Sequence, residues 1–243
     1  MTVEIVSLHV DAHDPVALAR FWAGVLGREV LGDTADDVAL PPGDETGFVI
    51  RFGRTEVAKQ GPNQMHFDLS SATPQEQAAT VERALATGAS HLDVGQLPEE
   101  EHVVLADPEG NEFCVVEAGN GFLEGTGRIG CLSSDGTRRL GHFWSSALGW
   151  PLVWDQDEET AIQSPRGGTK ISWGGPPLAP RSGTERLHWH VAPPAGGDRD
   201  SEVEALIGLG ATLIDRGGED TEQVRMADPD GNEFRVLHAG ATG

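Results

Sequence analysis

The sequence contains no tyrosine and only two cysteines, Cys114 and Cys131. Two cysteines without CxxC spacing are too few for a disulfide framework, so we expect both to be reduced thiols. No stretch approaches the roughly 20 apolar residues that a membrane helix requires. The opening residues, MTVEIVSLHVDAHD, also lack the basic and apolar regions of a secretory signal. We therefore expect a cytoplasmic protein.

Basic residues are scarce, since 17 lysines and arginines stand against 39 aspartates and glutamates, for a net charge of −22. A surface this acidic repels nucleic-acid backbones and anionic head groups, so we expect neither a nucleic-acid nor a membrane partner. It attracts cationic small molecules, although acidity also serves solubility alone. With 243 residues, of which 38% are hydrophobic, the chain has the size and composition of two globular domains.

Three segments of the sequence occur twice in the same order. FWAGVLG (21–27) returns as FWSSALG (143–149), VERALATGASHLD (81–93) as VEALIGLGATLID (203–215), and ADPEGNEF (106–113) as ADPDGNEF (227–234). A repeat this long is a domain duplication. We predict one domain over residues 1–119, a glycine-rich linker over 120–127 and a second domain over 128–243. The two domains are expected to pair within the chain, and a homodimer is left open.

Each predicted domain contains the pattern βαβββ twice. The strand IVSLHVDA leads into the helical pattern DPVALARFWAGVLG, which has an aspartate at its start and Gly27 as its stop. A second helix begins after Thr73 as cap, with Pro74 in its first position. This order predicts an α+β fold of two tandem domains, in which two βαβββ modules form a curved, cup-shaped mixed sheet with helices on its outer face.

The duplicated octapeptide is typical of a tight turn. Proline presets φ, glycine and asparagine accept left-handed conformations, and aspartate caps the turn. We expect structural rather than catalytic roles for Asp107, Asn111, Asp228 and Asn232. The pairs Phe21–Trp22 and Phe143–Trp144 are expected in the core.

Strand alternation predicts which side chains face the cup. In the first strand, the residues expected beneath the helices are Val6, Leu8 and Val10, which leaves Ile5, Ser7 and His9 in the cup. The same reasoning places His66, Asp68 and Cys114 on the open face. His9 and His66 begin equivalent strands, so we expect them to approach each other across one sheet.

The strand with His9, the helix ARFWAGVLG, the strand MHFDL and the turn DPEGN together resemble the vicinal oxygen chelate superfamily. This superfamily includes glyoxalase I, extradiol dioxygenases, fosfomycin-resistance enzymes and bleomycin-binding proteins. The resemblance covers nearly the whole chain, as two glyoxalase-like domains in tandem. It implies a fold more strongly than an activity, because the superfamily spans several chemistries and includes members that only bind.

The resemblance implies a metal site only in part. Metal-using relatives hold a divalent ion on the first strand, on the first strand of the second module and on a glutamate of the last strand. His9 and His66 match the first two positions, but Cys114 replaces the glutamate, and the nearby cation of Arg51 disfavours a metal. In the second domain Cys131 and His188 match the two histidines, and Arg235 replaces the glutamate, which favours an anion or a polar oxygen. We expect no cofactor, with a divalent metal in the first domain as the alternative.

Several residues are candidates for function. Histidine titrates near neutral pH, so His66 with Asp68, or His188 with His190, are the candidates for proton transfer. The candidate ligand contacts are Arg51, Cys114, Cys131, Trp173 and Arg235, where Trp173 would wall a flat apolar site. A cationic or aromatic ligand would suit the acidic field.

The leading hypothesis is a protein of the glyoxalase or bleomycin-resistance type that holds a small organic molecule in its cup without a full set of metal ligands. It leaves open whether the protein only binds this molecule or also transforms it. The alternative is a divalent-metal-dependent lyase, isomerase or dioxygenase that uses His9 and His66; the absence of tyrosine argues against the dioxygenase. A purely structural role would instead predict cups filled by side chains.

Overall fold

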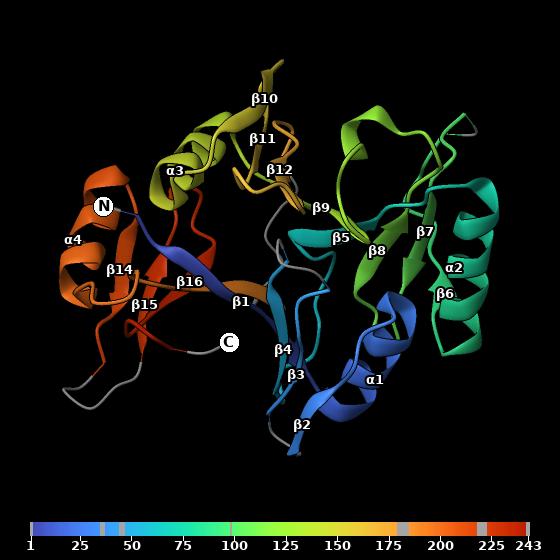
Figure 1. The fold of residues 1–243 in the computed structure, drawn as a ribbon, viewed down its shortest axis with the longest axis horizontal. Coiled ribbons are helices and arrows are strands. Elements are labelled where there is room, and N and C mark those ends of the chain that lie inside the picture. Colours follow the sequence, from blue (N-terminus) through green and yellow to red (C-terminus); the bar gives the residue numbers. More distant parts are fainter. Residues whose placement is uncertain are drawn as a thin grey trace.

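The computed structural model describes residues 2–34, 37–43, 47–97, 99–178, 185–217 and 223–241. These residues form four successive βαβββ modules, which we number 1 to 4 along the chain (Figure 1). No helix in the described ranges has the length and apolar character needed to cross a membrane. The predicted α+β class, with helices on one face of mixed sheets, is confirmed.

The modules have the following elements. Module 1 has β1 (Glu4–Ala12), α1 (Pro15–Leu26), β2 (Leu31–Thr34), β3 (Asp37–Leu40) and β4 (Val49–Arg54). Module 2 has β5 (Met65–Leu69), α2 (Pro74–Ala86), β6 (Ser90–His91), β7 (Val103–Ala106) and β8 (Glu112–Val115), followed by the 3-10 turn η1 (Gly121–Leu123). Module 3 has β9 (Ile129–Ser134), α3 (Arg138–Leu148), β10 (Leu152–Gln156), β11 (Glu159–Gln163) and β12 (Lys170–Trp173). Module 4 has β13 (Leu187–Ala192), α4 (Arg199–Leu209), β14 (Thr212–Asp215), β15 (Gln223–Ala227) and β16 (Glu233–Leu237).

The helix boundaries follow the predicted local chemistry. The side chain of Asp14 accepts a hydrogen bond from the backbone N–H of Ala17, and α1 ends at Gly27 in the left-handed conformation, with φ of 68°. Thr73 caps α2 in the same way, and Pro74 occupies its first turn. Phe21, Trp22, Phe143 and Trp144 are buried in the core, as predicted.

The four modules form two eight-stranded sheets. Sheet A joins modules 1 and 4, in the order β14-β15-β16-β13-β1-β4-β3-β2. Sheet B joins modules 2 and 3, in the order β10-β11-β12-β9-β5-β8-β7-β6. The central contacts are antiparallel, β1 with β13 and β5 with β9 (Figure 1). Each sheet therefore combines one module from each copy of the sequence repeat.

This pairing corrects the expected approach of His9 to His66. His9 lies on β1 of sheet A, where it faces His188 on β13, whereas His66 lies on β5 of sheet B, where it faces Ser133 on β9. The expected pairing of Cys131 with His188 is wrong for the same reason, because Cys131 lies on β9 of sheet B. Alternation along a strand predicts which face a residue occupies, but it carries no information about which distant strand becomes the neighbour.

Hydrogen bonds between helices and turns connect module 1 to module 2 and module 3 to module 4. Trp22 on α1 donates from Nε1 to Asp107 Oδ2 at 3.1 Å, which ties module 1 to module 2. Trp144 on α3 donates to Asp228 Oδ2 at 3.4 Å, which ties module 3 to module 4. Asp107 and Asp228 also accept from the backbone N–H groups of their own turns, so the structural role predicted for the octapeptide is confirmed. The two sequence repeats are thus interlocked.

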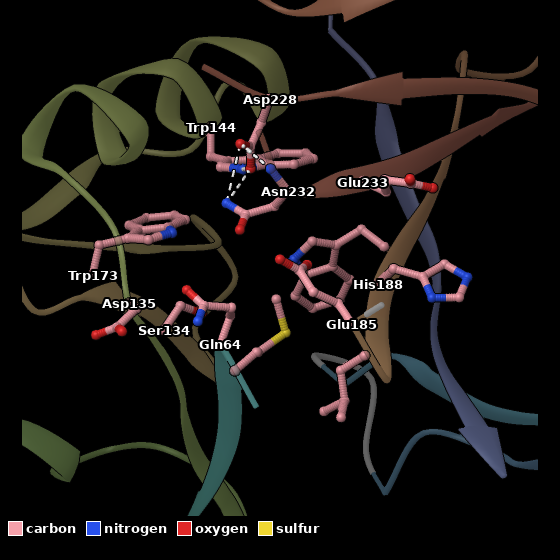
Figure 2. Close-up of a pocket in the computed structure, with 13 residues that line it drawn as sticks. Gln64, Ser134, Asp135, Trp144, Trp173, Glu185, His188, Asp228, Asn232 and Glu233 are labelled. Carbon is pink, nitrogen blue, oxygen red and sulfur yellow. Dashed lines mark hydrogen bonds between the residues drawn. The ribbon is translucent and has the colours of Figure 1, made fainter. Parts of the chain in front are cut away.

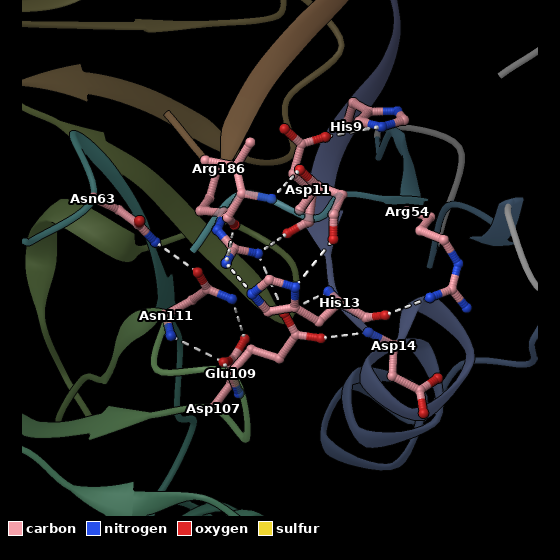
Figure 3. A network of polar contacts seen from close by, with 12 residues as sticks. His9, Asp11, His13, Asp14, Arg54, Asn63, Asp107, Glu109, Asn111 and Arg186 are labelled. Atoms are coloured by element: carbon pink, nitrogen blue, oxygen red, sulfur yellow. Dashed lines mark hydrogen bonds and ion pairs between the residues drawn. The ribbon is translucent and has the colours of Figure 1, made fainter. Parts of the chain in front are cut away.

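A buried polar network strengthens this interlock (Figure 3). Arg186, 3% exposed and just before β13, donates to the backbone oxygens of Asp11 and Val57 and to Glu109 Oε2. Glu109 also accepts from the backbone N–H groups of His13 and Asp14 at the start of α1. The network therefore joins three modules at one point.

A β-bulge in β1 changes which side chains at the start of this strand face the cup. The register of β1 against β13 shifts between Ile5 and Ser7. Ile5 consequently packs against the hydrophobic core, while Leu8 and Val10 are buried in it as predicted. The predicted core position of Val6 and cup position of Ile5 are wrong, because an extra residue in one strand reverses the alternation before it.

Candidate functional site

The concave face of each sheet carries one cluster of ionisable side chains. We call the face of sheet A cup A and that of sheet B cup B. The cup A cluster is His9, His188 and His190, and the cup B cluster is His66, Asp68 and Cys114; within each, the nitrogen, oxygen or sulfur atoms lie within 4.8 Å of one another. The predicted metal pair of His9 with His66 is therefore divided between two clusters.

Cup B contains a large cavity, with a volume of about 890 Å³. Strands of modules 2 and 3 supply its floor, where His66, Cys114, Ser133 and Ser172 line it. Aromatic and acidic side chains form other parts of the wall, namely Phe122, Trp154, Trp173, Glu112, Asp135 and Glu159. A volume of this size is typical of small-molecule sites.

A chain of polar contacts runs across the floor of cup B. His66 Nε2 lies 3.3 Å from Asp68 Oδ1, and Ser133 donates from Oγ to Asp68 Oδ2 at 2.5 Å. Ser133 Oγ is also 3.2 Å from Ser172 Oγ, which accepts a hydrogen bond from Cys131 Sγ at 3.2 Å. The carboxylate of Asp68 is thereby fixed between a histidine and a serine.

These contacts stabilise the charged forms of both His66 and Asp68. Burial by itself lowers the pKa of His66, but the hydrogen bond and charge of Asp68, with a contact to Cys114, outweigh it and raise the pKa to about 10. Burial alone would raise the pKa of Asp68, but the hydrogen bond from His66 and its charge, aided by Ser133, lower it. At neutral pH the pair is an imidazolium held by a carboxylate.

The two thiols of cup B are neutral at physiological pH. Burial raises the pKa of Cys114, an effect opposed by its contact with His66 and increased by the charge of Asp68. Burial, with the charge of Asp68, raises the pKa of Cys131 to about 12. Since the thiolate is the reactive form, neither cysteine is an activated nucleophile in this environment.

Cup A has a different character, because imidazoles and arginines gather there. The ring centroid of His9 lies 4.8 Å from that of His188 and 4.9 Å from that of His190, on which it stacks. Arg235 pairs with His190 across β16 and β13, and its Nε donates to His188 Nε2 at 3.2 Å. Arg51 lies beside His9 on β4.

The histidines of module 4 are uncharged. Burial lowers the pKa of His188 well below its ordinary value, and electrostatic interactions with His9, His190 and Arg235 disfavour its protonated form further. Burial, with His9, Arg235 and Arg51, lowers the pKa of His190 to about 3. Neutral imidazoles can bind a metal, but the donor of Arg235 already occupies His188 Nε2, and the arginines repel a cation. Cup A therefore does not fit a divalent metal.

The remaining predicted residue, Trp173, is 3% exposed and belongs to the hydrophobic core, while its edge lines the cavity of cup B. A separate cavity beside Trp144 and Asp228 holds only about 20 Å³, room for a single water molecule, and is no ligand site (Figure 2). The sequence reasoning missed Ser133 and Ser172 as members of cup B. Alternation from Cys131 along its strand would have found Ser133, once β9 was known to pair with β5.

Comparisons with known proteins agree with this architecture. A sequence model described as a glyoxalase-like domain matches residues 7–116 and, a second time, residues 131–237. No curated protein shows a significant sequence match. Among solved structures, glyoxalase I from Zea mays is 12% identical, with a TM-score of 0.67 over 98% of this chain and 92% of that one. A putative dioxygenase from Bacillus subtilis is 13% identical, with a TM-score of 0.65 over 99% of this chain and 86% of that one. At these identities the likeness concerns the fold.

Proposed function

This chain belongs to the glyoxalase-like domain family, as two tandem domains, and we propose that it binds a small organic molecule in cup B and transfers a proton to it without a metal ion. The observation that carries the proposal is the cavity of about 890 Å³ whose floor holds the His66–Asp68 pair. A cup used only as structure would be filled by side chains, whereas this one has room for a ligand.

The cavity wall suggests the class of ligand. Glu112, Asp135 and Glu159 contribute carboxylates to it, and no lysine or arginine is among the described residues that line it. Lys59 pairs with Glu112 at 2.8 Å and so neutralises one of these charges. Phe122 and Trp154 add aromatic surface. An aromatic molecule with a cationic group suits this combination, because rings stack on rings and carboxylates attract the charge.

The proposed chemistry assigns one role to each member of the pair. Asp68 holds the proton at Nε2 of His66 and so fixes both the orientation and the charge of the ring. The Nδ1–H bond of the imidazolium then breaks as its proton passes to an oxygen or nitrogen of the bound molecule, which leaves a neutral imidazole with its remaining proton at Nε2. A proton from solvent restores the imidazolium. Ser133 keeps the carboxylate of Asp68 in place. A positively charged donor would stabilise negative charge that develops on the ligand.

A metal-dependent enzyme is the second candidate, and one observation favours it. His66, Asp68 and Cys114 present nitrogen, oxygen and sulfur within 4.8 Å of one another, a donor set that suits zinc, and the adjoining cavity leaves room for a further ligand. These three residues would hold the ion, which would polarise an oxygen of the bound molecule. The neutral thiol and the existing His66–Asp68 ion pair favour the metal-free proposal.

Native mass spectrometry of protein purified without chelator distinguishes the two candidates. The metal-free proposal expects a retained organic molecule, or the apoprotein mass, with no stoichiometric metal. The second candidate expects one zinc ion per chain that disappears in the double variant His66→Ala/Cys114→Ala. In the second outcome the metal-free proposal is wrong.

We also propose that the protein acts in the cytoplasm and that its two repeats pair within one chain, with a homodimer as a further assembly. Both cysteines are free thiols, which agrees with a reducing compartment. Cell fractionation and light scattering would test location and assembly respectively, and a secreted or exclusively membrane-associated protein would contradict the first.

A further inference from the structure

Cup A contains polar atoms that the fold leaves without partners. Among the residues that the structure describes, Ser7 Oγ, His9 Nδ1 and His190 Nε2 are buried and make no hydrogen bond. Ser7 is 1% and His190 9% exposed, and the side chain of His9 is 17% exposed. Buried polar groups normally have partners, so three such atoms on one concave face point to a missing ligand.

These atoms share one face of sheet A. Ser7 lies opposite His190, and His9 lies opposite His188, in the antiparallel ladder of β1 and β13. His190 in turn lies beside Arg235 on β16, and His9 lies beside Arg51 on β4. In-register neighbours project to the same side of a sheet. The unpartnered atoms therefore lie in two neighbouring rows, one next to Arg235 and the other next to Arg51.

The charge of this face of sheet A indicates the charge of the ligand that it would bind. Within the described part of the chain, no carboxylate forms an ion pair with Arg235. Arg225, opposite it on β15, pairs with Glu233 at 2.8 Å, and Asp11 Oδ1 lies 3.5 Å from His9 Nε2, so these two carboxylates offset part of the positive charge. The positive field is strong enough to contribute to the low pKa of His190, although burial is its main cause. In a chain with only 17 basic residues, this concentration on one concave face is unusual. Such a field repels a metal cation and attracts an anion.

We propose that cup A is a second ligand site, which binds the oxyanion group, a carboxylate or a phosphate, of a small molecule through Arg235, Arg51 and the side chains of Ser7 and His190. A guanidinium group donates two parallel hydrogen bonds to a carboxylate or a phosphate, and neutral imidazole and hydroxyl groups supply further hydrogen-bond donors. The site would give the two cups opposite preferences, an anion in cup A and a cationic or aromatic molecule in cup B. It does not depend on the function proposed for cup B.

Isothermal titration calorimetry at fixed ionic strength tests the proposal, with sodium benzoate and inorganic phosphate as separate probes. Binding of at least one probe to the wild-type protein is expected, and the probe that binds identifies the carboxylate or the phosphate as the favoured group. Arg235→Gln should weaken binding by at least about tenfold, the effect of losing one charge-assisted hydrogen bond. Arg235→Lys should retain part of the affinity. Arg54→Gln is the matched control on the same strand as Arg51, because Arg54 donates to the backbone of His13 at the strand end, and it should leave binding unchanged.

Histidine-ring NMR provides an independent readout: the ring signals of His190 should shift on addition of the probe in the wild type and in Arg54→Gln, and should shift far less in Arg235→Gln. Gly174→Trp, which fills part of cup B, should not change oxyanion binding, so a failure of the cup B proposal is distinguishable. Two results would overturn the proposal: neither probe binds, or Arg235→Gln and Arg54→Gln behave alike. Zinc binding that is lost in His190→Ala would replace the anion site with a metal site.

Discussion

Arg186 donates from Nη1 to Glu109 Oε2 across 3.2 Å, which joins the strand at the centre of sheet A to a turn of sheet B. Arg186→Met would leave the carboxylate of Glu109 buried and without one of its hydrogen-bond partners. We expect the free energy of unfolding to fall by about 3 kcal/mol. Urea denaturation measures the change. Arg216→Met is the control, because Arg216 makes only exposed ion pairs and its loss should cost less than about 1 kcal/mol. An equal loss of unfolding free energy in the two variants would show that the buried network stabilises the fold no more than an exposed ion pair does.

The raised pKa of His66 predicts a pH-dependent stability. A histidine whose pKa is about 10 in the folded chain and about 6.5 when unfolded adds stability that is complete below pH 6.5. This contribution is lost as the pH rises from 6.5 through 10, because the folded state then releases the extra proton. Urea melts at several pH values should show a steeper decline for the wild type than for His66→Gln. Parallel curves would mean that the imidazolium is not held by Asp68 as described.

The ring of His9 occupies space that only a glycine provides. A Cβ atom at Gly53 would overlap Nε2 of His9, so Gly53→Ala should displace the ring from its stack on His190 and cost about 1–3 kcal/mol. Gly24→Ala offers the matched control, because a Cβ there meets nothing within 4 Å in the middle of helix α1. That substitution should stabilise the protein by roughly 0.5–1 kcal/mol. Thermal melts of both variants decide the matter, and a neutral Gly53→Ala would contradict the packing of His9.

The shared sheets predict that neither repeat is complete alone. A fragment of residues 1–119 would expose β1 and β5, which pair with β13 and β9 in the whole chain. Unpaired central strands seek partners, so we expect the fragment to dimerise or aggregate. Size-exclusion chromatography with light scattering tests this expectation. A stable, folded monomer of the fragment would mean that the cross-repeat pairing is dispensable.

Local features of this fold were predictable from the sequence, and its long-range pairings were not. Asp14, Gly27, Thr73 and the two octapeptide turns act within a few residues of their own positions, so their chemistry is visible in the sequence. The choice of β13 rather than β5 as the neighbour of β1 depends on packing between distant modules, which no local pattern records.

The same distinction explains the candidate sites. The sequence placed His66, Asp68 and Cys114 together on one open face, and the structure gathers them in cup B. His188 and His190 also share a face, but their partner His9 comes from the other repeat, so the composition of cup A could not be assembled from the sequence. Ser133 and Arg186 were missed because their importance arises only from residues that the fold brings to them.

The most direct test of the central claim, that cup B binds a small organic molecule, is ligand-observed NMR with benzylamine, benzyl alcohol and benzoate as probes. Gly174 lines the cavity and Gly208 lies on the outer helix α4, and a Cβ at either position meets nothing within 4 Å. The account predicts saturable binding of benzylamine, tighter than benzyl alcohol, that is abolished by Gly174→Trp and retained by Gly208→Trp. Benzylamine that fails to bind the wild type, or that binds Gly174→Trp equally well, would contradict it.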